Sequence, residues 1–427
     1  MKVLILSMVP QRDWIVDNMI ADAVKARGHD ACVRKFLADD RTAIVIERPD
    51  VVVLPVVRCQ YTRDLATRLK QWGVKVIARR SEAGVSRKRY DTLSKIWRDD
   101  QIGRYEYKDI IDLELVWGRE FADVLIAEGK VMPEQIRCIG GITLDPYFRW
   151  NLAKESAKIF CSRQQWFDKH KLDPLKRTIF FVTGFVHADK TDFTLPEAPV
   201  GDPIHGELQH RDETLRVLWV RAIEKLSRSG KWNIVVRPHH GEQMDVYNSL
   251  NHGVCVSTEG SAGESLFHSD LMVHAGSTMA VEAHILKKPA LRFGNTAQDE
   301  LVGDISPKFG TIDQLIAAIV SATFGESNAK IKTLSDLEKS FFGKIDGKAH
   351  ERCADAICEF GTQETTIPDE WPSDELQDYG SPDVVAINPE AQIVYCRACK
   401  KGSQNFTDNP SWRCPHCGIM ITKVRSI

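Results

Sequence analysis

The sequence predicts an α/β protein with two successive halves, each built on a parallel, doubly wound sheet, followed by a small metal-binding module. Three observations support this prediction. Short apolar runs alternate with segments of helical spacing through residues 1–150, which is the pattern of a parallel sheet covered by helices on both faces. The same alternation starts again near residue 178. Two C-x-x-C pairs near the end of the sequence are typical of a zinc site.

The first half, residues 1–150, is the N-terminal domain of this prediction. VVVLPVV at 51–57 is apolar throughout, as expected of a strand buried on both faces. Gly28 follows a segment of helical spacing and is expected to end it, because glycine commonly occupies the position after a helix. On the same grounds the sequence predicts strands at 3–8, 31–36, 74–79, 112–118 and 136–141, and helices at 17–27, 62–72 and 119–129.

The second half, residues 151–360, repeats the alternation after a connector of helical character. TIFFVTG (178–184) has the pattern of a buried strand, and a polar loop is expected at 186–210. Further strands are predicted at 233–239, 254–258, 270–276 and 289–294, and helices at 212–229, from 277, at 311–323 and at 334–360. Residues 361–383 are rich in Asp, Glu, Pro, Ser and Thr and are expected to form an acidic linker. Residues 384–427 form the metal-binding module.

Composition excludes several classes of protein. The net charge of the 427 residues is −2, so no overall positive field attracts nucleic acid, and no nucleic-acid partner is expected. No apolar stretch approaches the ~18 residues of a membrane span. The beginning, MKVLILSMVPQRDW, lacks a cleavage site of the signal-peptide kind and is interpreted as the first strand. We expect a cytoplasmic protein and leave open a peripheral contact with the inner face of a membrane.

Four of the eleven cysteines form two pairs, Cys396 with Cys399 and Cys414 with Cys417, separated by residues 400–413. Each pair can place two thiolates on one metal, and two pairs complete a tetrahedron. The spacing favours zinc over the iron of a rubredoxin-like site, and no βαβ pattern surrounds the pairs to suggest a redox role. Because four thiolates leave no open position, the zinc is expected to be structural. The other seven cysteines are expected to be reduced thiols.

A strand expected to end at His274 is followed by small residues and then by a helix. Gly276 would let backbone amides approach a ligand. Ser277 and Thr278 add hydroxyls at the helix N-terminus, which attracts anionic groups such as phosphate. Glu282 lies one turn further on the same face as Thr278, where a carboxylate could accept hydrogen bonds from ribose hydroxyls. The alternative is a helix cap formed by Ser277 or Thr278, with Glu282 in solvent.

Two other loops follow strand ends in the second half. Arg237 and His239, in VVRPHHGE, emerge at the carboxyl end of a strand, where open α/β sheets bind ligands. A guanidinium and an imidazole suit a phosphate leaving group. Thr183, Gly184 and Lys190 lie in the loop after the first strand of this half and could flank the same phosphate. The alternatives are ordinary structural roles in these loops.

Taken together, these segments resemble those of GT-B glycosyltransferases and their relatives. VVRPHHGE resembles their R/K-PHP-x-E stretch. SDLMVHAGSTMAVEAHILKKPALRF resembles their segment that contains the motif Gly-Ser-Thr and, shortly after it, Glu-Ala. GREFADVLIAEGKVMPEQIRCIGG and FFGKIDGKAHERCADAI are similar to the end of their first domain and to their closing helix. The resemblance covers about residues 1–360. It is greatest to the bacterial group that makes surface carbohydrate (lipopolysaccharide or capsule), and more distant to UDP-GlcNAc 2-epimerases, CDP-glycerol transferases and transferases that use CMP-sugars.

The resemblance implies two Rossmann-like domains facing a cleft, with a nucleotide-sugar donor bound by the second and a glycan or lipid-linked acceptor by the first. It implies that the phosphates meet Ser277 and Thr278, that the ribose meets Glu282, and that Arg237 or His239 meets the leaving group.

The sequence also departs from the family pattern. His240 stands in place of the second proline of PHP, and Lys287 stands in place of a glycine. The zinc ribbon lies outside the common core.

An inverting transferase needs a base that takes the proton of the acceptor hydroxyl. Glu82, just after a predicted strand, is the first candidate and Asp13, in the loop after the first strand, is the second. Ordinary surface roles are the alternative for both. A basic run near Glu82 could bind an anionic acceptor or could form a solvated face; it consists of Arg79, Arg80, Arg87, Lys88 and Arg89.

Three functions are compatible with these features. The first is a glycosyltransferase that builds surface polysaccharide without a catalytic metal, since no clear D-x-D element is present. The second is a nucleotide-sugar 2-epimerase, which would share the fold and the phosphate motif. The third is a non-catalytic scaffold that docks to assembly machinery through the zinc ribbon.

Overall fold

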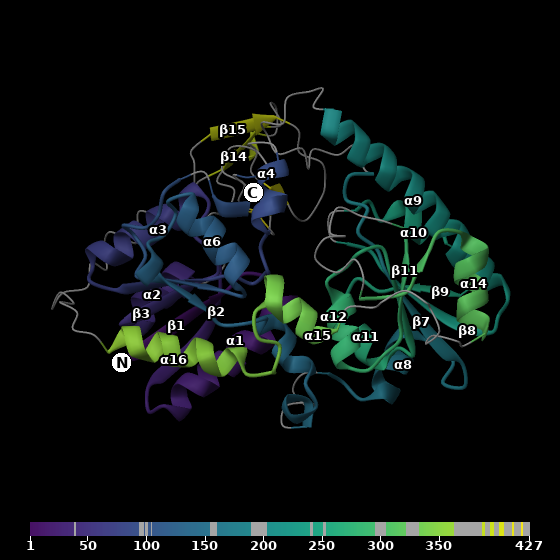
Figure 1. Ribbon diagram of the computed structural model, residues 1–427, viewed down its shortest axis with the longest axis horizontal. Helices are drawn as coiled ribbons and strands as arrows, with labels where there is room; N and C mark the ends of the chain where they lie inside the picture. The colour runs from purple at the N-terminus through teal and green to yellow at the C-terminus, as the bar shows by residue number, and fades with distance from the viewer. Residues whose placement is uncertain are drawn as a thin grey trace. The chain divides into compact units, whose positions relative to one another are not determined.

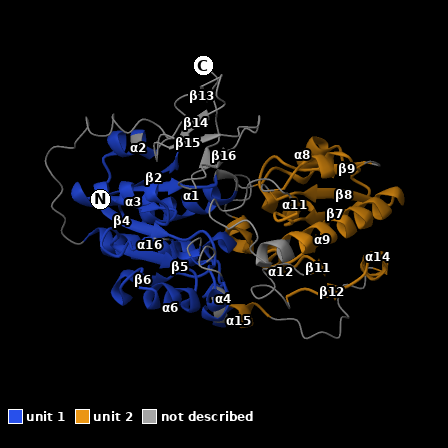
Figure 2. Ribbon diagram, turned by 90° about the horizontal axis from the view of Figure 1, so that it is seen from above, with its two compact units in different colours: residues 1–145, 195–197, 338–427 blue, residues 146–194, 198–337 orange. Residues whose placement is uncertain are grey.

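The computed structural model describes residues 1–37, 40–93, 98, 101–103, 105–153, 160–188, 203–239, 242–250, 253–294, 305–321 and 333–362, and five short strands beyond residue 386. The chain divides into two compact units (Figure 2). Unit 1 comprises Met1–Asp145, Leu195–Glu197 and Glu338–Ile427, and unit 2 comprises Pro146–Thr194 and Ala198–Leu337. Most of unit 2 is therefore inserted in the chain between two parts of unit 1.

Unit 1 is built on a six-stranded parallel sheet in the order β2-β1-β3-β4-β5-β6. Its strands are β1 (Lys2–Ser7), β2 (Asp30–Lys35), β3 (Val51–Leu54), β4 (Lys75–Arg79), β5 (Leu113–Val116) and β6 (Ile136–Cys138). Its helices are α1 (Pro10–Ala26), α2 (Asp40–Glu47), α3 (Gln60–Gln71), α4 (Arg87–Thr92), α6 (Arg119–Ala127) and α16 (Ala349–Gly361). The parallel, doubly wound sheet predicted for the first half is confirmed.

The central strands of unit 1 are buried on both faces. Every residue of β3 and β4 is buried, as expected of a parallel sheet covered on both sides. In α3, Leu65 and Leu69 lie four residues apart and both enter the core, where each buried leucine contributes roughly 1.5–3 kcal/mol. α16 packs along α1 (Figure 1), and Arg27 of α1 pairs with Asp355 of α16 at 2.7 Å.

Unit 2 contains a second six-stranded parallel sheet, in the order β12-β11-β10-β7-β8-β9. Its strands are β7 (Arg177–Val182), β8 (Trp232–Arg237), β9 (Val254–Val256), β10 (Leu271–His274), β11 (Ala290–Phe293) and β12 (Lys308–Phe309). Its helices are α8 (Arg163–His170), α9 (Pro203–Arg228), α10 (Asp245–Asn248), α11 (Ala262–His268), α12 (Met279–Ile285), α14 (Ile312–Ser321) and α15 (Leu334–Leu337).

Trp219 of α9 anchors the core of unit 2. Its ring is fully buried and meets the rings of Phe181 and Phe185 edge to face, at centroid distances of 5.7 and 5.4 Å. Its indole Nε1–H donates to the carbonyl of Phe293 at 3.1 Å. Because a buried indole needs such an acceptor, this bond fixes α9 against β11 on one face of the sheet.

Several helices differ from the sequence prediction, and α1 begins at Pro10 rather than at residue 17. α9 begins at Pro203, inside the predicted loop 186–210, and proline suits the first position of a helix. α12 begins at Met279 and not at Ser277. The predicted helix 334–360 is instead α15, a π-helical turn at Glu338–Phe342, and α16.

Glycine geometry explains the break before α16. Gly343 and Gly347 have φ of +57° and +70°, in the region that other residues disfavour. A Cβ at Gly343 would lie 2.1 Å from the carbonyl oxygen of Trp117, so the close packing of these two segments requires glycine.

Five short strands lie beyond residue 386. β13 (Ile387–Asn388), β14 (Ile393–Cys396) and β15 (Lys401–Gln404) form one antiparallel sheet, and β16 (Trp412–Arg413) pairs with β17 (Met420–Ile421). Cys399, Cys414 and Cys417 lie outside the described residues, and for Cys396 the structure describes only the backbone. Within the described parts of the chain, no helix has the length and apolar character needed to cross a membrane.

Candidate functional site at the carboxyl edge of the unit 2 sheet

The strand order of unit 2 reverses between β7 and β10. From β7 the chain proceeds outward through β8 and β9, and from β10 it proceeds the other way through β11 and β12. In open parallel sheets the loops after the two strands at such a switch point diverge, and ligands bind between them at the carboxyl edge. Here those loops contain Thr183 and Gly184 after β7, and Ala275 to Thr278 after β10. The structure therefore brings two of the predicted loops to adjacent strands.

His274 is the last residue of β10 and is fully buried. Its Nδ1 accepts a hydrogen bond from the backbone N–H of Gly276 at 3.1 Å, so the ring proton lies on Nε2, which donates to Ser306 Oγ at 2.9 Å. Burial, with a smaller contribution from Arg292, lowers the pKa of His274 to about 3. A neutral His274 therefore shapes the loop. Its ring accepts the hydrogen bond of the Gly276 amide, which we expected from the sequence to face a ligand.

Gly276 and Ser277 set the geometry of the turn into α12. Gly276 is buried with φ of +121°, which glycine adopts without strain. Ser277 Oγ accepts a hydrogen bond from the N–H of Met279 at 3.2 Å, as a serine near a helix start commonly does. Ser277 and Thr278 are both partly exposed, so their hydroxyls remain close to solvent at the carboxyl edge.

Glu282, in the first turn of α12, interacts with Tyr147. The phenol donates to the Glu282 carboxylate, and this bond, together with burial, raises the pKa of Tyr147 well above its ordinary value. Gly263 of α11 lies against the same phenol, since a Cβ there would be 2.1 Å from the Tyr147 oxygen. Tyr147 therefore orients Glu282 and occupies part of its accepting capacity. No local sequence pattern indicates this partner, which lies 135 residues earlier in the chain.

A buried carboxylate links the loops after β7 and β8. Glu242 is 6% exposed. It accepts hydrogen bonds from Thr183 Oγ1 at 2.5 Å, from the backbone N–H of His239 at 3.0 Å and from the hydroxyl of Tyr247. Burial raises its pKa, although these donors act in the opposite direction. Thr183 is consequently a structural link between the loops, and the His239 side chain is exposed beside it.

Arg237, at the end of β8, is engaged by the protein itself. Its guanidinium donates to the carbonyls of Ser257, Glu259 and Gly260 at 3.1, 2.8 and 2.7 Å. Burial lowers its pKa. Arg237 thus holds the loop after β9 in place. By contrast, a Cβ at Gly184 would meet no described atom within 4 Å, so that position faces open space. Lys190 and His240 lie outside the described residues.

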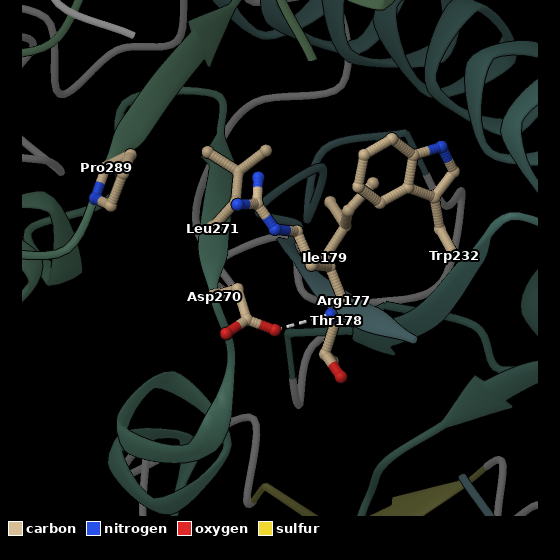
Figure 3. A pocket seen from close by; sticks show the side chains of 7 residues that line it. All are labelled: Arg177, Thr178, Ile179, Trp232, Asp270, Leu271 and Pro289. Carbon is tan, nitrogen blue, oxygen red and sulfur yellow. Dashed lines mark hydrogen bonds between the residues drawn. The ribbon is translucent and has the colours of Figure 1, made fainter. Parts of the chain in front are cut away.

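A pocket of about 320 Å³ lies at the opposite, amino edge of the same sheet (Figure 3). Its lining side chains come from strand beginnings, and Asp270 accepts a hydrogen bond from the N–H of Thr178 at 2.8 Å. Because the strands are parallel, this pocket is separated from the predicted loops by the length of the sheet. Its lining residues are Arg177, Thr178, Ile179, Trp232, Asp270, Leu271 and Pro289.

In unit 1 the strand order reverses between β1 and β3, so the loop after β1 lies at a switch point. Asp13 lies in the first turn of α1 and not in the predicted loop; it is fully buried and accepts from Arg12 Nε at 2.7 Å and from Ser81 Oγ at 3.4 Å. Arg12 Nη1 also donates to Glu82 at 2.9 Å, and the Glu82 side chain is 77% exposed. Arg12 therefore joins the two predicted carboxylates, and Glu82 is the accessible one.

The basic run after β4 does not form one positive face. Arg79 is buried and pairs with Asp17 at 2.6 Å. Arg80 is also buried, with its guanidinium on Glu114 and on the Tyr107 hydroxyl at 2.5 and 2.8 Å. The prediction of a continuous basic surface is wrong for these two arginines, because both are neutralised within the core of unit 1.

The fold of this chain is similar to that of several solved structures. UDP-GlcNAc 2-epimerase of Neisseria meningitidis, bound to UDP-GlcNAc, matches with a TM-score of 0.55 at 13% identity, over 84% of this chain and 100% of the other. MnaA of S. aureus in a co-structure with UDP matches at 0.53 and 14%, over 87% and 99%. Both units have the Rossmann-like fold of GT-B enzymes.

Other comparisons extend this result. The wall teichoic acid polymerase TagF matches with a TM-score of 0.52 at 12% identity, over 84% of this chain and 88% of the other. A family model described as "Protein of unknown function (DUF354)" matches residues 203–301, which include α9, β8, β10 and α12. No curated protein matches the sequence.

Proposed function

We propose that this protein acts on a nucleotide sugar, with the nucleotide bound at the carboxyl edge of the unit 2 sheet. The observation that carries this proposal is the switch point between β7 and β10, where a glycine-containing loop with two partly exposed hydroxyl residues lies beside an oriented carboxylate. The GT-B fold, which several nucleotide-sugar enzymes share, supports it.

In this proposal the hydroxyls of Ser277 and Thr278 bind phosphate oxygens, and Glu282 accepts a hydrogen bond from a ribose hydroxyl. Tyr147 leaves Glu282 with accepting capacity for that role, because an ionised carboxylate has about four acceptor sites and one phenol uses one of them. His239, exposed next to Thr183, would meet the leaving group. Arg237 acts as a positioning residue, because its guanidinium holds the loop after β9.

For the reaction we propose glycosyl transfer to a surface-glycan or lipid-linked acceptor. Glu82 would take the proton of the acceptor hydroxyl as that oxygen attacks the anomeric carbon and the nucleotide leaves. Its exposure and its bond with Arg12, which orients the carboxylate, suit this role better than the burial of Asp13. The similarity to TagF, a polymerase of wall teichoic acid, is in keeping with a transfer reaction.

A 2-epimerase reaction is the second candidate, because several solved structures with this fold are UDP-GlcNAc 2-epimerases. The two reactions give different products from one substrate. Incubation with UDP-GlcNAc followed by NMR separates them, since an epimerase forms the 2-epimer in the absence of any acceptor. Release of UDP and free sugar without a 2-epimer favours the transferase.

Titration calorimetry with UDP, GDP, CMP and CDP tests the nucleotide site itself. We expect one nucleotide to bind, and Ser277→Ala and Glu282→Ala each to weaken it about 10-fold or more, because each removes a hydrogen bond to a charged or polar group. Ser321→Ala, which removes an exposed hydroxyl at the end of α14, should leave the affinity unchanged. If none of the four nucleotides binds, both enzyme proposals fail and the scaffold function is favoured.

We also propose a structural zinc ion in the C-terminal module, bound by Cys396, Cys399, Cys414 and Cys417. The strand pairing supports it. Cys396 pairs with Lys401 at the end of the β14–β15 hairpin, and β16 pairs with β17 on either side of residues 414–419. In the sequence, each C-x-x-C pair therefore stands at the connection between two strands that pair antiparallel, which is the order expected of a zinc ribbon. A module this small needs the metal for its folding.

Removing this zinc should unfold the module and spare the nucleotide site. We expect amide hydrogen exchange in β14 to β17 to rise sharply after treatment with a strong chelator, because metal binding supplies the folding free energy of such a module. The affinity for the nucleotide identified above should stay within about twofold, as for independent sites. A large loss of nucleotide affinity on chelation would place the module in the active site and contradict the proposal.

A further inference from the structure

Cys161, Glu264 and His268 converge in unit 2, on the segment before α8 and on α11. Glu264 and His268 are four residues apart in α11 and so project from the same side of the helix. Cys161 precedes α8 in the chain. One potential ligand atom of each residue (the thiol sulfur, a carboxylate oxygen and a ring nitrogen) lies within 4.8 Å of the other two.

Backbone hydrogen bonds hold these three residues together. The N–H of Cys161 donates to Glu264 Oε1 at 2.9 Å, and His268 Nε2 lies 2.9 Å from the carbonyl oxygen of Cys161. Since a carbonyl only accepts, Nε2 carries the proton and the ring lone pair is on Nδ1. Ligating histidines are commonly oriented by such a bond from the nitrogen that does not bind the metal. His268 is 3% exposed, whereas Cys161 and Glu264 are partly exposed, so the cluster can be reached from solvent.

We propose that Cys161, Glu264 and His268 form a second zinc site, distinct from the four C-terminal cysteines. A thiolate, an imidazole and a carboxylate are the three ligand types that Zn²⁺ accepts, at about 2.0–2.3 Å each. To bind one ion at these distances, the three ligand atoms must come closer together, which requires side-chain movements of roughly an ångström. Three protein ligands leave the fourth tetrahedral position for water.

The charges around the cluster act in both directions on a divalent cation. Without a metal, the thiol of Cys161 donates to Glu264. Zinc would displace the thiol proton, which passes to solvent, and the resulting thiolate and carboxylate neutralise the two positive charges of the ion. The cationic groups of Lys169, Arg163 and Lys288 also face the cluster, so the net positive potential selects against ions that lack a strong bond to sulfur.

Binding at this site would clamp the chain before α8 to α11. The same helix contacts the phenol of Tyr147 through Gly263, and Tyr147 donates to Glu282. The zinc would therefore stiffen the support of the carboxylate that we assign to the ribose.

The test is zinc analysis of the full chain by mass spectrometry, after loading with zinc chloride and removal of excess ion. The variant with all four C-terminal cysteines changed to serine removes the ribbon site. We expect this variant to retain about one zinc per chain, and to lose it when Cys161→Ser is added. Cys255→Ser is the matched control, because Cys255 is another partly buried thiol beside a histidine, with its sulfur 3.4 Å from His170 Nδ1. It should leave the zinc content unchanged.

Glu264→Gln separates a ligand role from a structural role, since the amide oxygen can still accept from the N–H of Cys161. We expect this variant, in the background without the C-terminal cysteines, to bind zinc at least about 10-fold more weakly in competition with a chromophoric chelator. Cobalt in the same background should give a thiolate charge-transfer band that Cys161→Ser abolishes. Absence of zinc from the background variant while its circular dichroism is unchanged, or equal zinc with and without Cys161, would overturn the proposal.

Discussion

Replacing Arg79 with methionine should lower the free energy of unfolding of unit 1 by about 3–5 kcal/mol, because it leaves the buried carboxylate of Asp17 without its counter-charge. Both side chains are essentially inaccessible, and Arg79 Nη2 donates to Asp17 Oδ1 at 2.6 Å. Among the described residues, Arg79 Nε and Nη1 and Asp17 Oδ2 have no further partner, so the pair depends on its single direct bond. Hydrogen exchange of peptides from α1 and β4 measures the change.

The pH dependence of this loss distinguishes an ion pair from simple packing. Burial raises the pKa of Asp17 to about 6, although Arg79 acts in the opposite direction. Because the folded-state pKa exceeds the unfolded one, the stability that Asp17 contributes is greatest in acid and is lost as pH rises through about 6. Without Arg79 that pKa rises further, so the cost of Arg79→Met should be larger at pH 8 than at pH 5.

A double variant provides the control. Asp17→Leu combined with Arg79→Met removes both charges and replaces them with apolar groups, and such replacements of buried pairs are often close to neutral. We therefore expect the double variant to be more stable than Arg79→Met alone. Equal stability of the two variants, or a cost that does not change with pH, would mean that the pair contributes through packing and not through charge.

Glu242→Leu should have a comparable effect in unit 2. The substitution leaves the hydroxyls of Thr183 and Tyr247 without this acceptor, and each buried donor so abandoned costs about 1–3 kcal/mol. The N–H of His239 loses its bond with Glu242 and keeps the one with Thr183 Oγ1 at 3.2 Å. We expect a loss of about 3–5 kcal/mol in the free energy of unfolding of unit 2. Nucleotide affinity should also fall, because Glu242 fixes the loops after β7 and β8 relative to each other. Hydrogen exchange in β7 and β8 and calorimetry measure the two effects.

Two further variants show whether the acceptor is what matters. Glu242→Gln keeps one acceptor oxygen and should lose much less than Glu242→Leu. Glu224→Leu, on α9 where the partly exposed carboxylate pairs with Arg228 at 3.1 Å, should change stability by no more than about 0.5 kcal/mol. A Glu242→Leu protein as stable as the parent would show that water or a rearranged loop replaces the carboxylate.

The alternation of strands and helices could be predicted because it depends on local pattern. VVVL of β3 and IFFV of β7 are apolar at every position, as is typical of a strand buried on both faces. The positions of the predicted loops followed from the same pattern, since parallel strands bring their carboxyl ends to one edge. Thr183, Arg237 and His274 accordingly lie at the carboxyl ends of the adjacent strands β7, β8 and β10.

What each polar residue binds could not be predicted, because its partner is distant in sequence. Arg237 has the chemistry of a phosphate ligand, but three backbone carbonyls of the loop after β9 surround it. His274 has the chemistry of a ligand contact, but its ring bonds Gly276 and Ser306. Whether a charged residue is buried also could not be predicted from its neighbours in the sequence. The arginines at 79 and 80 suggested a solvent-facing surface, and Asp17 and Glu114 instead neutralise them in the core.

The inserted position of unit 2 has a consequence for biosynthesis. Unit 1 is closed by residues made after unit 2. Asp145 accepts from His350 Nδ1 at 2.7 Å, and Arg352 Nε donates to the carbonyl of Ile139 at 2.7 Å. While the ribosome has delivered only residues 1–145, the surface of α1 that α16 covers is exposed, and it stays exposed until about two hundred further residues have been added. Unit 2, nearly contiguous in the chain, can fold first. During translation, unit 2 can therefore complete its fold before unit 1 does. The nascent N-terminal half is the part most in need of a chaperone.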